Sequence, residues 1–375
     1  MSGDAATGLR VMRGRRVLVT GHTGFKGSWL AEWLLELGAE VTGLALAPAT
    51  DPSLFDMLGL AARLTDHRGD VRSLETVLRE VDDAKPDVIF HLAAQAIVRT
   101  AYVEPVATFA TNVMGTVHLL DAVRTLGRPC AVVVVTSDKC YEDRSLRRPY
   151  TEDDPLGGHD PYSASKGAAE LVAASYRRSF FAPERFAQHG VSLATVRAGN
   201  VIGGGDWSSD RVVSDIMGSL SAGQPVRLRN PGAVRPWQHV LDALSGYLWL
   251  GARMFKDGAY GLAGPWNFGP DPGDAIPVSE LTEQMLRAWG SGSWIDAREP
   301  NAVHEAGYLS LDAGKAAQQL AWRPTWRVNE AIEATVAWYK AAVRGADRAA
   351  FTRGQIASFT ARAKALGLPW AGAAR

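Results

Sequence analysis

The chain has few cysteines, and this scarcity sets the first limits on its chemistry. Cys130 and Cys140 are the only two among its 375 residues. A secreted protein of this size usually carries more, and their spacing is not the C-x-x-C of a redox or zinc pair. We therefore expect two buried or half-buried thiols, a reducing compartment and no metal site.

Neither charge nor hydropathy directs the chain to a polymer or a membrane. Lys plus Arg and Asp plus Glu both number 40, so the net charge is zero, which argues against nucleic acid as a partner. No apolar run approaches the roughly 20 residues needed to span a bilayer. Residues 1–13 lack the apolar centre of a signal peptide. We expect a flexible N-terminal tail, no membrane contact and a cytoplasmic location.

What the sequence does contain, over its first 200 residues, is a regular alternation of strand and helix patterns. Short apolar runs predict buried parallel strands, and apolar residues at helical spacing lie between them. This order predicts an α/β fold, a Rossmann-type doubly wound parallel sheet with a smaller C-terminal lobe. The predicted strands are 17–19, 41–46, one before Gly69, 87–90, 131–135 and 191–196, and the predicted helices include 105–126, 162–180 and 331–344.

The regular alternation fades after Asn200, where turn clusters such as Gly203-Gly204-Gly205 separate shorter elements. We divide the chain accordingly into four parts. They are a flexible tail at 1–13, a dinucleotide-binding domain with the catalytic residues at 14–200, a mainly substrate-binding lobe at 201–350 and a C-terminal tail at 351–375.

A glycine-rich loop follows the first predicted strand. Gly21, Gly24 and Gly27 permit a tight turn, close approach of the backbone to a pyrophosphate and close packing of the next helix. The start of that helix offers backbone N–H groups to phosphates, so the loop predicts dinucleotide binding. The acidic residue expected after the second strand is missing, since residues 46–48 are Leu-Ala-Pro. The residues alone therefore leave NAD and NADP open.

Two later segments predict proton chemistry beside that loop. Tyr162 and Lys166 are four residues apart, so on a helix they share one face. The Lys166 ammonium can favour the phenolate of Tyr162 and lower its pKa, which is ordinarily about 10. Ser137 follows the fifth strand and can hydrogen-bond the same substrate oxygen. Together these groups predict a site that takes the proton of an alcohol while hydride leaves its carbon.

At this point the segments resemble a known family, the extended short-chain dehydrogenases/reductases. The resemblance lies in the TGxxGxxG loop at 20–27, HLAAQ at 91–95, Ser137 and the YxxxK pair at 162–166. Longer segments are similar to the CDP-glucose 4,6-dehydratase group within that family, and the similarity covers roughly residues 16–344. These segments are GHTGFKGSWL at 21–30, TSDKCY at 136–141, RAGNVIGGGDW at 197–207 and RPWQHV at 235–240.

The resemblance implies bound NAD, a nucleotide sugar in the C-terminal lobe and conversion of CDP-glucose to its 4-keto-6-deoxy product. Tyr162 would deprotonate the C4 hydroxyl, and Asp138 would protonate the departing C6 hydroxyl. Many sugar dehydratases of this family have Glu after that Asp as the C5 base, whereas this chain has Lys139. Our hypothesis is that neutral Lys139 is the base, which requires a lowered pKa. The alternative is that Lys139 binds substrate electrostatically.

The resemblance also implies binding residues and an assembly. Asn112 is expected to support the active site, whereas His22 and Lys26 could simply be solvated. Helices 105–126 and 162–180 resemble those that pair into a four-helix homodimer interface. The implied cofactor contacts are Gly21, Thr23, Gly24, Phe25, Lys26, Gly27, Asp70, Val71, Leu92, Ala93, Ala94, Tyr162 and Lys166, and the implied substrate contacts are Gln95, Arg99, Asn200, Arg235, His304 and Tyr308.

Two other functions compete with this interpretation. A nucleotide-sugar 4-epimerase needs Tyr162 and Lys166 but no Asp138 and Lys139, so the second pair argues against it. A non-catalytic dinucleotide-binding regulator would tolerate loss of Tyr162 or Ser137, and both are present. Fold alone does not separate the three.

Overall fold

A seven-stranded parallel sheet forms the centre of the protein. The computed structural model describes residues 8–144, 148–258, 261–298 and 309–372. Every neighbouring pair in the sheet is parallel, and the order is β10-β6-β5-β4-β1-β2-β3. This confirms the doubly wound α/β prediction, with chain reversal beside β1. The strands are β1 Arg16–Thr20, β2 Glu40–Ala45, β3 Thr65–Arg68, β4 Val88–His91, β5 Cys130–Val135, β6 Val191–Arg197 and β10 Gly264–Asn267.

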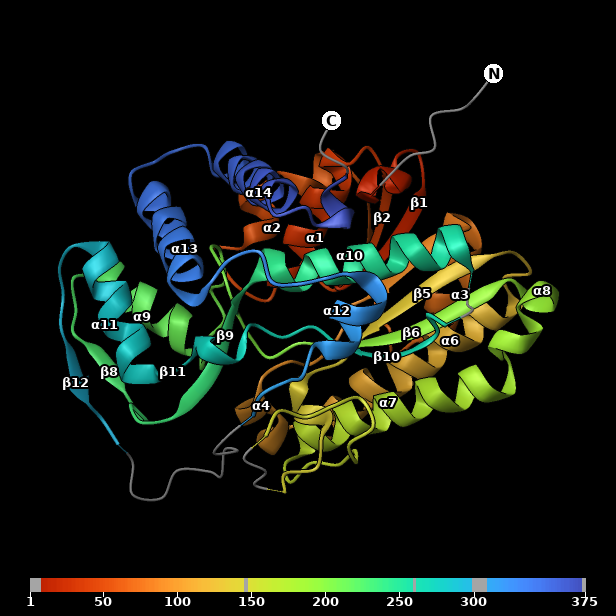
Figure 1. The fold of residues 1–375 in the computed structure, drawn as a ribbon, viewed down its shortest axis with the longest axis horizontal. Helices are drawn as coiled ribbons and strands as arrows, with labels where there is room; N and C mark the ends of the chain where they lie inside the picture. The colour runs from red at the N-terminus through yellow and green to blue at the C-terminus, as the bar shows by residue number, and fades with distance from the viewer. Residues whose placement is uncertain (1–7, 145–147, 259–260, 299–308, 373–375) are drawn as a thin grey trace.

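Helices cover both faces of this sheet (Figure 1). Successive side chains on a strand point to opposite faces, so Val17 and Val19 of β1 join one core cluster and Leu18 joins the other. The first cluster includes helices α1 Phe25–Glu36 and α10 Val240–Asp257. The second includes α3 Leu74–Ala84, α6 Gly115–Thr125 and α7 Pro161–Ser179. The central strands are buried on both faces, which explains their uninterrupted apolar runs.

The stretch Pro105–Thr125 is long and apolar enough to cross a membrane by composition. It consists of α5 Pro105–Phe109, a π-helical turn at Ala110–Met114 and α6. Leu119, Leu120 and Val123 of α6 are buried in the second core cluster against α3 and the sheet. The α6 part of this stretch therefore belongs to the core of the α/β domain.

In its described residues, the second lobe contains two small sheets and three helices, which lie to one side of the main sheet (Figure 1). One small sheet has the order β11-β9-β7 and the other pairs β12 with β8. The strands are β7 Asn200–Ile202, β8 Val226–Leu228, β9 Val234–His239, β11 Ala275–Pro277 and β12 Trp294–Asp296. The helices are α9 Val212–Ser221, α11 Val278–Trp289 and α13 Val328–Val343.

Shorter helices connect these layers. The short α-helices are α2 Leu54–Met57, α4 Val98–Val103, α8 Phe186–His189 and α12 Gly314–Leu320. Single 3₁₀ turns occur at Gly8–Met12, Leu60–Ala62, Asp138–Cys140, Pro183–Arg185, Pro272–Asp274 and Pro369–Ala371. Both cysteines are free and buried, as expected.

Residues after Asn200 also contribute to the main sheet and to the helices that cover it. Helix α10 packs on β5, and β10 pairs with β6 at the sheet edge. Pro265 in β10 is tolerated because an edge strand needs fewer ladder hydrogen bonds. We therefore propose a division in which residues 240–267 belong to the dinucleotide-binding domain, while the rest of 201–343 forms the second lobe.

The first and last described segments pack on the core, since residues 8–12 contact α10 and α14 contacts α1. The expectation of a flexible tail at 1–13 is wrong for its last residues, because Leu9 and Met12 are buried in the first core cluster. At the other end, α14 Arg348–Ala365 places Phe359 between Trp33 of α1 and Trp370, with ring centroids 5.8 Å and 5.6 Å apart from Phe359. The C-terminal segment is therefore part of the core.

Replacing Phe359 with alanine should lower the free energy of unfolding by about 3 kcal/mol, because a fully buried ring would leave a cavity among tryptophans. Urea unfolding monitored by tryptophan fluorescence measures this change. Leu366→Ala is the matched control, since Leu366 is 49% exposed and should change stability by less than about 0.5 kcal/mol. Equal effects of the two substitutions would contradict the packing role of α14.

Candidate active site

The loop after β1 forms a cradle for a dinucleotide. Gly21 has φ 76°, and a Cβ there would lie 2.7 Å from the backbone nitrogen of Ala93. A Cβ on Gly27 would lie 2.1 Å from the carbonyl oxygen of Gly21. Gly24 is the N-cap of α1 and supplies no capping side chain, and the first turn has no acidic residue. The free N–H groups of this turn fit the pyrophosphate of NAD.

The side chains around the cradle lie mostly at strand ends. Thr23 Oγ1 donates a hydrogen bond to the carbonyl oxygen of Leu46 at 3.1 Å. His22 is fully buried, contrary to a solvated position, and its Nε2 lies 2.8 Å from Asp66 of β3. Burial lowers the pKa of His22, although Asp66 opposes this change. His22 thus holds the loop to β3, and Phe25 packs partly buried on the core.

The predicted adenine contact at Asp70 is already engaged within the chain. The Asp70 carboxylate accepts hydrogen bonds from Arg72 at 2.6 Å and 2.8 Å, and these bonds hold the pKa of Asp70 below its ordinary value. Val71 is buried, and its carbonyl oxygen lies 2.9 Å from Nδ1 of His118. An adenine contact by Asp70 would have to be shared with Arg72.

The segment after β4 meets both the cradle and the catalytic helix. Leu92, Ala93 and Ala94 follow β4, and the Ala93 N–H donates to Thr20 Oγ1 at 3.2 Å. Asn112, in the π-helical turn, donates to Ser165 Oγ at 2.8 Å and to the Gln95 carbonyl at 3.0 Å. Asn112 therefore links this segment to α7, which supports the role expected for it.

Gln95 itself is used internally. Its side-chain amide donates to Ile97 and Thr108, and its Oε1 accepts from the Ile97 N–H at 2.5 Å. The side chain that we predicted to touch the sugar therefore holds the loop in shape.

Helix α7 carries the predicted acid–base pair. Asp160 caps the helix by accepting from the Ser163 N–H at 2.9 Å, and Pro161 occupies the first helical position. Tyr162 and Lys166 then lie one turn apart, and both are buried. Lys166 Nζ donates to the Val135 carbonyl at 3.3 Å, which places it under the end of β5.

The protonation of this pair differs from our expectation. Burial raises the pKa of Tyr162 to about 12, although a hydrogen bond with Ser137 and the charge of Arg211 oppose this. Burial also lowers the pKa of Lys166 to about 8, with Cys140 and Glu170 opposing. The pKa of Tyr162 therefore changes in the direction opposite to the expected lowering, because loss of water outweighs the Ser137 hydrogen bond and the Arg211 charge.

The second predicted pair follows β5 directly. Ser137 Oγ donates to Asp138 Oδ1 at 2.9 Å and accepts from the Lys139 N–H at 3.2 Å, so Ser137 starts the short turn. Asp138 is buried, whereas Lys139 is half-buried. The carboxyl end of β5 therefore holds Ser137 and Asp138 beside Tyr162.

Two basic residues converge on the same space from other elements. Burial lowers the pKa of Lys26 to about 8, Arg211 and Lys166 lower it further, and Asp138 raises it. Arg211 pairs with Asp206 at 2.9 Å and acts on both Lys26 and Tyr162. Lys26 is half-buried and lies near the catalytic groups, and our sequence analysis missed Arg211. The sequence feature that could have indicated Arg211 is its position just after the RAGNVIGGGDW segment.

The four predicted substrate contacts that the structure describes are divided between the two lobes. Asn200 on β7 and Arg235 on β9 belong to one three-stranded sheet, and Arg235 is buried. Arg99 of α4 reaches across to Asp210 of the second lobe at 3.8 Å. The remaining two predicted contacts, His304 and Tyr308, lie outside the described residues.

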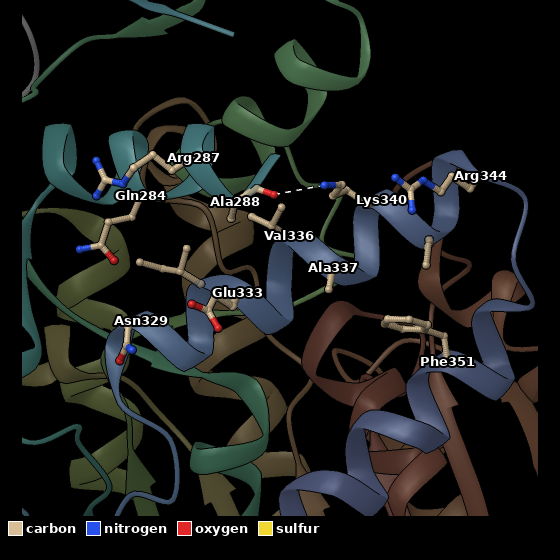
Figure 2. Close-up of a pocket in the computed structure, with 12 residues that line it drawn as sticks. Gln284, Arg287, Ala288, Asn329, Glu333, Val336, Ala337, Lys340, Arg344 and Phe351 are labelled. Atoms are coloured by element: carbon tan, nitrogen blue, oxygen red, sulfur yellow. Dashed lines mark hydrogen bonds between the residues drawn. The ribbon is translucent and has the colours of Figure 1, made fainter. Parts of the chain in front are cut away.

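A cavity of about 790 Å³ lies elsewhere, between α11 and α13 (Figure 2). Its lining includes Arg287, Glu333 and Lys340, and Lys340 Nζ donates to the Ala288 carbonyl at 3.2 Å. It contains none of the groups at the ends of β1 and β5, so it is not the candidate active site.

A doubly wound sheet, a glycine cradle after β1 and a Tyr/Lys pair beside β5 together define a nicotinamide-dependent enzyme of the short-chain type. A model of the NAD dependent epimerase/dehydratase family matches residues 17–263, and the chain belongs to that family.

Named relatives indicate which enzymes of this family the chain is similar to. The chain is 49% identical to CDP-glucose 4,6-dehydratase of Salmonella typhimurium over 92% of this chain and 96% of that protein. A crystal structure of dTDP-glucose 4,6-dehydratase from Streptomyces venezuelae with NAD is 27% identical, covers 86% of this chain and 96% of its own, and has a TM-score of 0.73. UDP-glucose 4-epimerase from Thermus thermophilus with NAD is also 27% identical over 87% and 99%, with a TM-score of 0.73.

Proposed function

We propose that this protein is an NAD-dependent hydro-lyase that converts CDP-D-glucose to CDP-4-keto-6-deoxy-D-glucose. The observation that carries the proposal is the 49% identity, over nearly the whole of both chains, to an enzyme of that name. The site agrees chemically, since Asp138 and Lys139 stand beside Tyr162, and a 4-epimerase would need only Tyr162 and Lys166.

The reaction has two parts, oxidation at C4 and elimination of water, and different residues act in each part. When bound, NAD would accept hydride from C4 and return it to C6. Tyr162 takes the proton of the C4 hydroxyl, and Ser137 hydrogen-bonds the same oxygen. The resulting C4 ketone makes the C5 proton acidic. A base removes the C5 proton while Asp138 protonates the C6 hydroxyl as it leaves. With hydride returned to C6 and a proton to C5, the net change would be loss of water.

The high pKa of Tyr162 is consistent with this sequence of steps. A tyrosine whose pKa is about 12 is protonated at neutral pH before ligands bind. The positive charge of an oxidised nicotinamide ring nearby would favour the phenolate. Tyr162 would therefore become a base only when the cofactor is in place.

We propose Lys139 as the base at C5. The Lys139→Ala variant should still oxidise C4 but should lose about a hundredfold in C5 hydrogen exchange, because no general base remains. Mass spectrometry of substrate incubated in deuterium oxide measures this exchange. Normal exchange in the variant would assign the proton to another group and leave Lys139 as an electrostatic contact.

Product analysis across four nucleotide sugars tests the function itself. Purified protein with CDP-, dTDP-, GDP- and UDP-glucose should give a 4-keto-6-deoxy product from CDP-glucose at the highest kcat/KM. An epimerised sugar would favour the 4-epimerase, and binding of NAD without turnover would favour a regulator. Either result would overturn the proposal.

We further propose a homodimer, in the cytoplasm, formed through α5, α6 and α7. Large apolar side chains are exposed on and beside these helices, which supports an interface. Val106→Asp combined with Leu171→Asp should convert a dimer to a monomer in light scattering, since charges would be buried. An unchanged mass would contradict this interface. The exposed residues are Tyr102, Val103, Val106, Phe109, Met114 and Leu171.

A further inference from the structure

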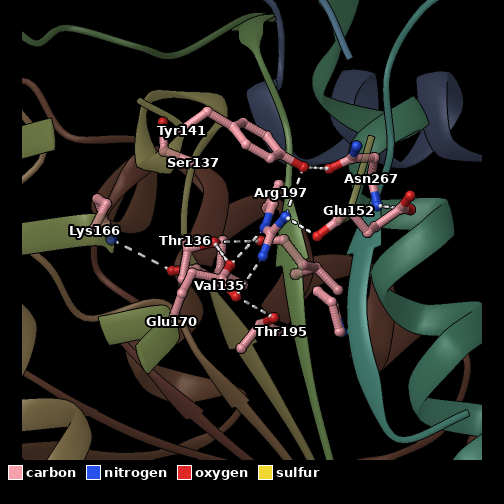
Figure 3. A network of polar contacts seen from close by, with 12 residues as sticks. Val135, Thr136, Ser137, Tyr141, Glu152, Lys166, Glu170, Thr195, Arg197 and Asn267 are labelled. Atoms are coloured by element: carbon pink, nitrogen blue, oxygen red, sulfur yellow. Dashed lines mark hydrogen bonds and ion pairs between the residues drawn. The ribbon is translucent and has the colours of Figure 1, made fainter. Parts of the chain in front are cut away.

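A buried ion pair, Arg197 with Glu170, belongs to a network of polar contacts that includes Thr136 and Tyr141 (Figure 3). Arg197, at the end of β6, donates through Nε and Nη2 to the Glu170 carboxylate at 2.8 Å and 2.9 Å. The two side chains are only 2% and 3% exposed. Burial would raise the pKa of Glu170, but the Arg197 charge and the hydrogen bonds it accepts hold that pKa below its ordinary value. Glu170 is therefore ionised.

The pair is tied to the first half of the active site through helix α7. Tyr162, Lys166 and Glu170 follow one another at four-residue spacing, so they lie along one face of the helix. The Glu170 carboxylate also accepts from Thr195 Oγ1 of β6 at 2.7 Å. The acid–base helix is thereby fixed against β6.

The same ion pair contacts both ends of residues 136–141, the segment that carries Asp138 and Lys139. At the start, Thr136 Oγ1 donates to Glu170 at 2.5 Å. At the end, Arg197 Nη1 donates to the Tyr141 hydroxyl at 2.6 Å, and that hydroxyl donates to Asn267 of β10 at 2.8 Å. Residues 137–140, which include Ser137, Asp138 and Lys139, lie between these two anchors.

Stability alone does not account for such a pair. Removing two charges from water costs several kcal/mol, and apolar residues of similar volume often stabilise a core equally well. What an arginine fork on a carboxylate adds is a fixed geometry. Here that geometry joins α7 to the 136–141 segment, the two elements that carry Tyr162 and Asp138.

We propose that Glu170 and Arg197 are positioning residues that hold Asp138 and Lys139 in register with Tyr162, so that oxidation and elimination act on one substrate pose. This inference rests on the proposed function. Tyr162 must reach the oxygen on C4 while Asp138 reaches the oxygen on C6. An error of about 1 Å in one group costs up to about a hundredfold in rate.

The test separates the two half-reactions. In a single turnover with CDP-glucose, the absorbance of reduced nicotinamide reports oxidation, and the 4-keto-6-deoxy product reports completion. Arg197→Lys keeps the charge but loses the fork, and Tyr141→Phe releases only one anchor. Both variants keep the hydrogen bond of Thr136 to Glu170, which anchors the Ser137 end of the segment. We therefore expect oxidation within about threefold of wild type and completion slowed by about ten- to a hundredfold. Reduced cofactor should then accumulate.

Glu32→Gln is the matched control for loss of a buried ion pair. Glu32 of α1 is fully buried and binds Arg63 at 2.5 Å and 3.0 Å, and it contacts no residue of the candidate active site among those described. It should lower stability without accumulation of reduced cofactor. If Arg197→Lys does not fold, Tyr141→Phe decides the question.

One result would contradict the positioning role, and a different result would contradict the proposed function. If the folded variants lose oxidation and completion in equal proportion, as a general loosening would cause, the positioning role is wrong. If wild-type protein forms no 4-keto product from CDP-glucose, the proposed function fails, whatever the variants do.

Discussion

Replacing Tyr162 with phenylalanine should lower kcat by about a thousandfold, which is the largest effect that we expect from one substitution. The phenol is the group that takes the C4 proton, and the oxidation that it permits precedes every later step. Phenylalanine fills the same buried space beside Ser137, so the fold should be retained. The rate of 4-keto product formation at saturating CDP-glucose measures the loss.

Tyr176→Phe on the same helix is the control. Tyr176 lies beside Phe180 with ring centroids 5.2 Å apart, well along α7 from the active site. Its substitution should leave kcat within about twofold, because only a hydroxyl far from the chemistry is removed. If Tyr162→Phe keeps more than a tenth of the wild-type rate, another group must take the C4 proton.

The second large effect should come from Asp138→Asn. An amide of the same shape cannot protonate the departing C6 hydroxyl, so product formation should fall by about a thousandfold. Oxidation at C4 does not need this acid. The variant should therefore accumulate reduced cofactor during a single turnover, which Tyr162→Phe should not do.

Asp121→Asn provides the matched control, because Asp121 is partly exposed on α6 and pairs only with Arg124 among the described contacts. It should complete the reaction at the wild-type rate. A fast Asp138→Asn enzyme, or one that fails already at oxidation, would remove Asp138 from the role of general acid. Because the two catalytic variants stop at different steps, their absorbance traces distinguish the two halves of the site.

The main sheet was predictable from sequence because its strands are buried on both faces. A continuous apolar run such as 131–135 predicts a buried strand when glycine turns and helix patterns surround it. The dinucleotide cradle was predictable for a similar local reason, since Gly21 and Gly27 stand where a Cβ would collide with backbone. All six predicted strands are present.

The rest depends on distant contacts that a local pattern does not contain. Strand β10 holds Gly264 and Pro265, which disfavour strand, and it forms because the edge of β6 is available. The pKa of Tyr162 depends on burial and on charges from both lobes, those of Asp138 and Arg211. Glu170 and Arg197 are 27 residues apart and meet only when α7 packs on β6. None of these is visible in a window of ten residues.

The return of α10 and β10 to the main sheet bears on how this enzyme can be re-engineered. A substrate lobe that followed the cofactor domain as one block could be exchanged at a single junction. Here the polypeptide enters the second lobe after Asn200 and returns to the main sheet at residues 240–267, which cover and extend it. It then enters the second lobe again. A chimera joined only at Asn200 would import a foreign edge strand and covering helix. Transplanting a new sugar specificity therefore calls for two separate inserts around a retained 240–267.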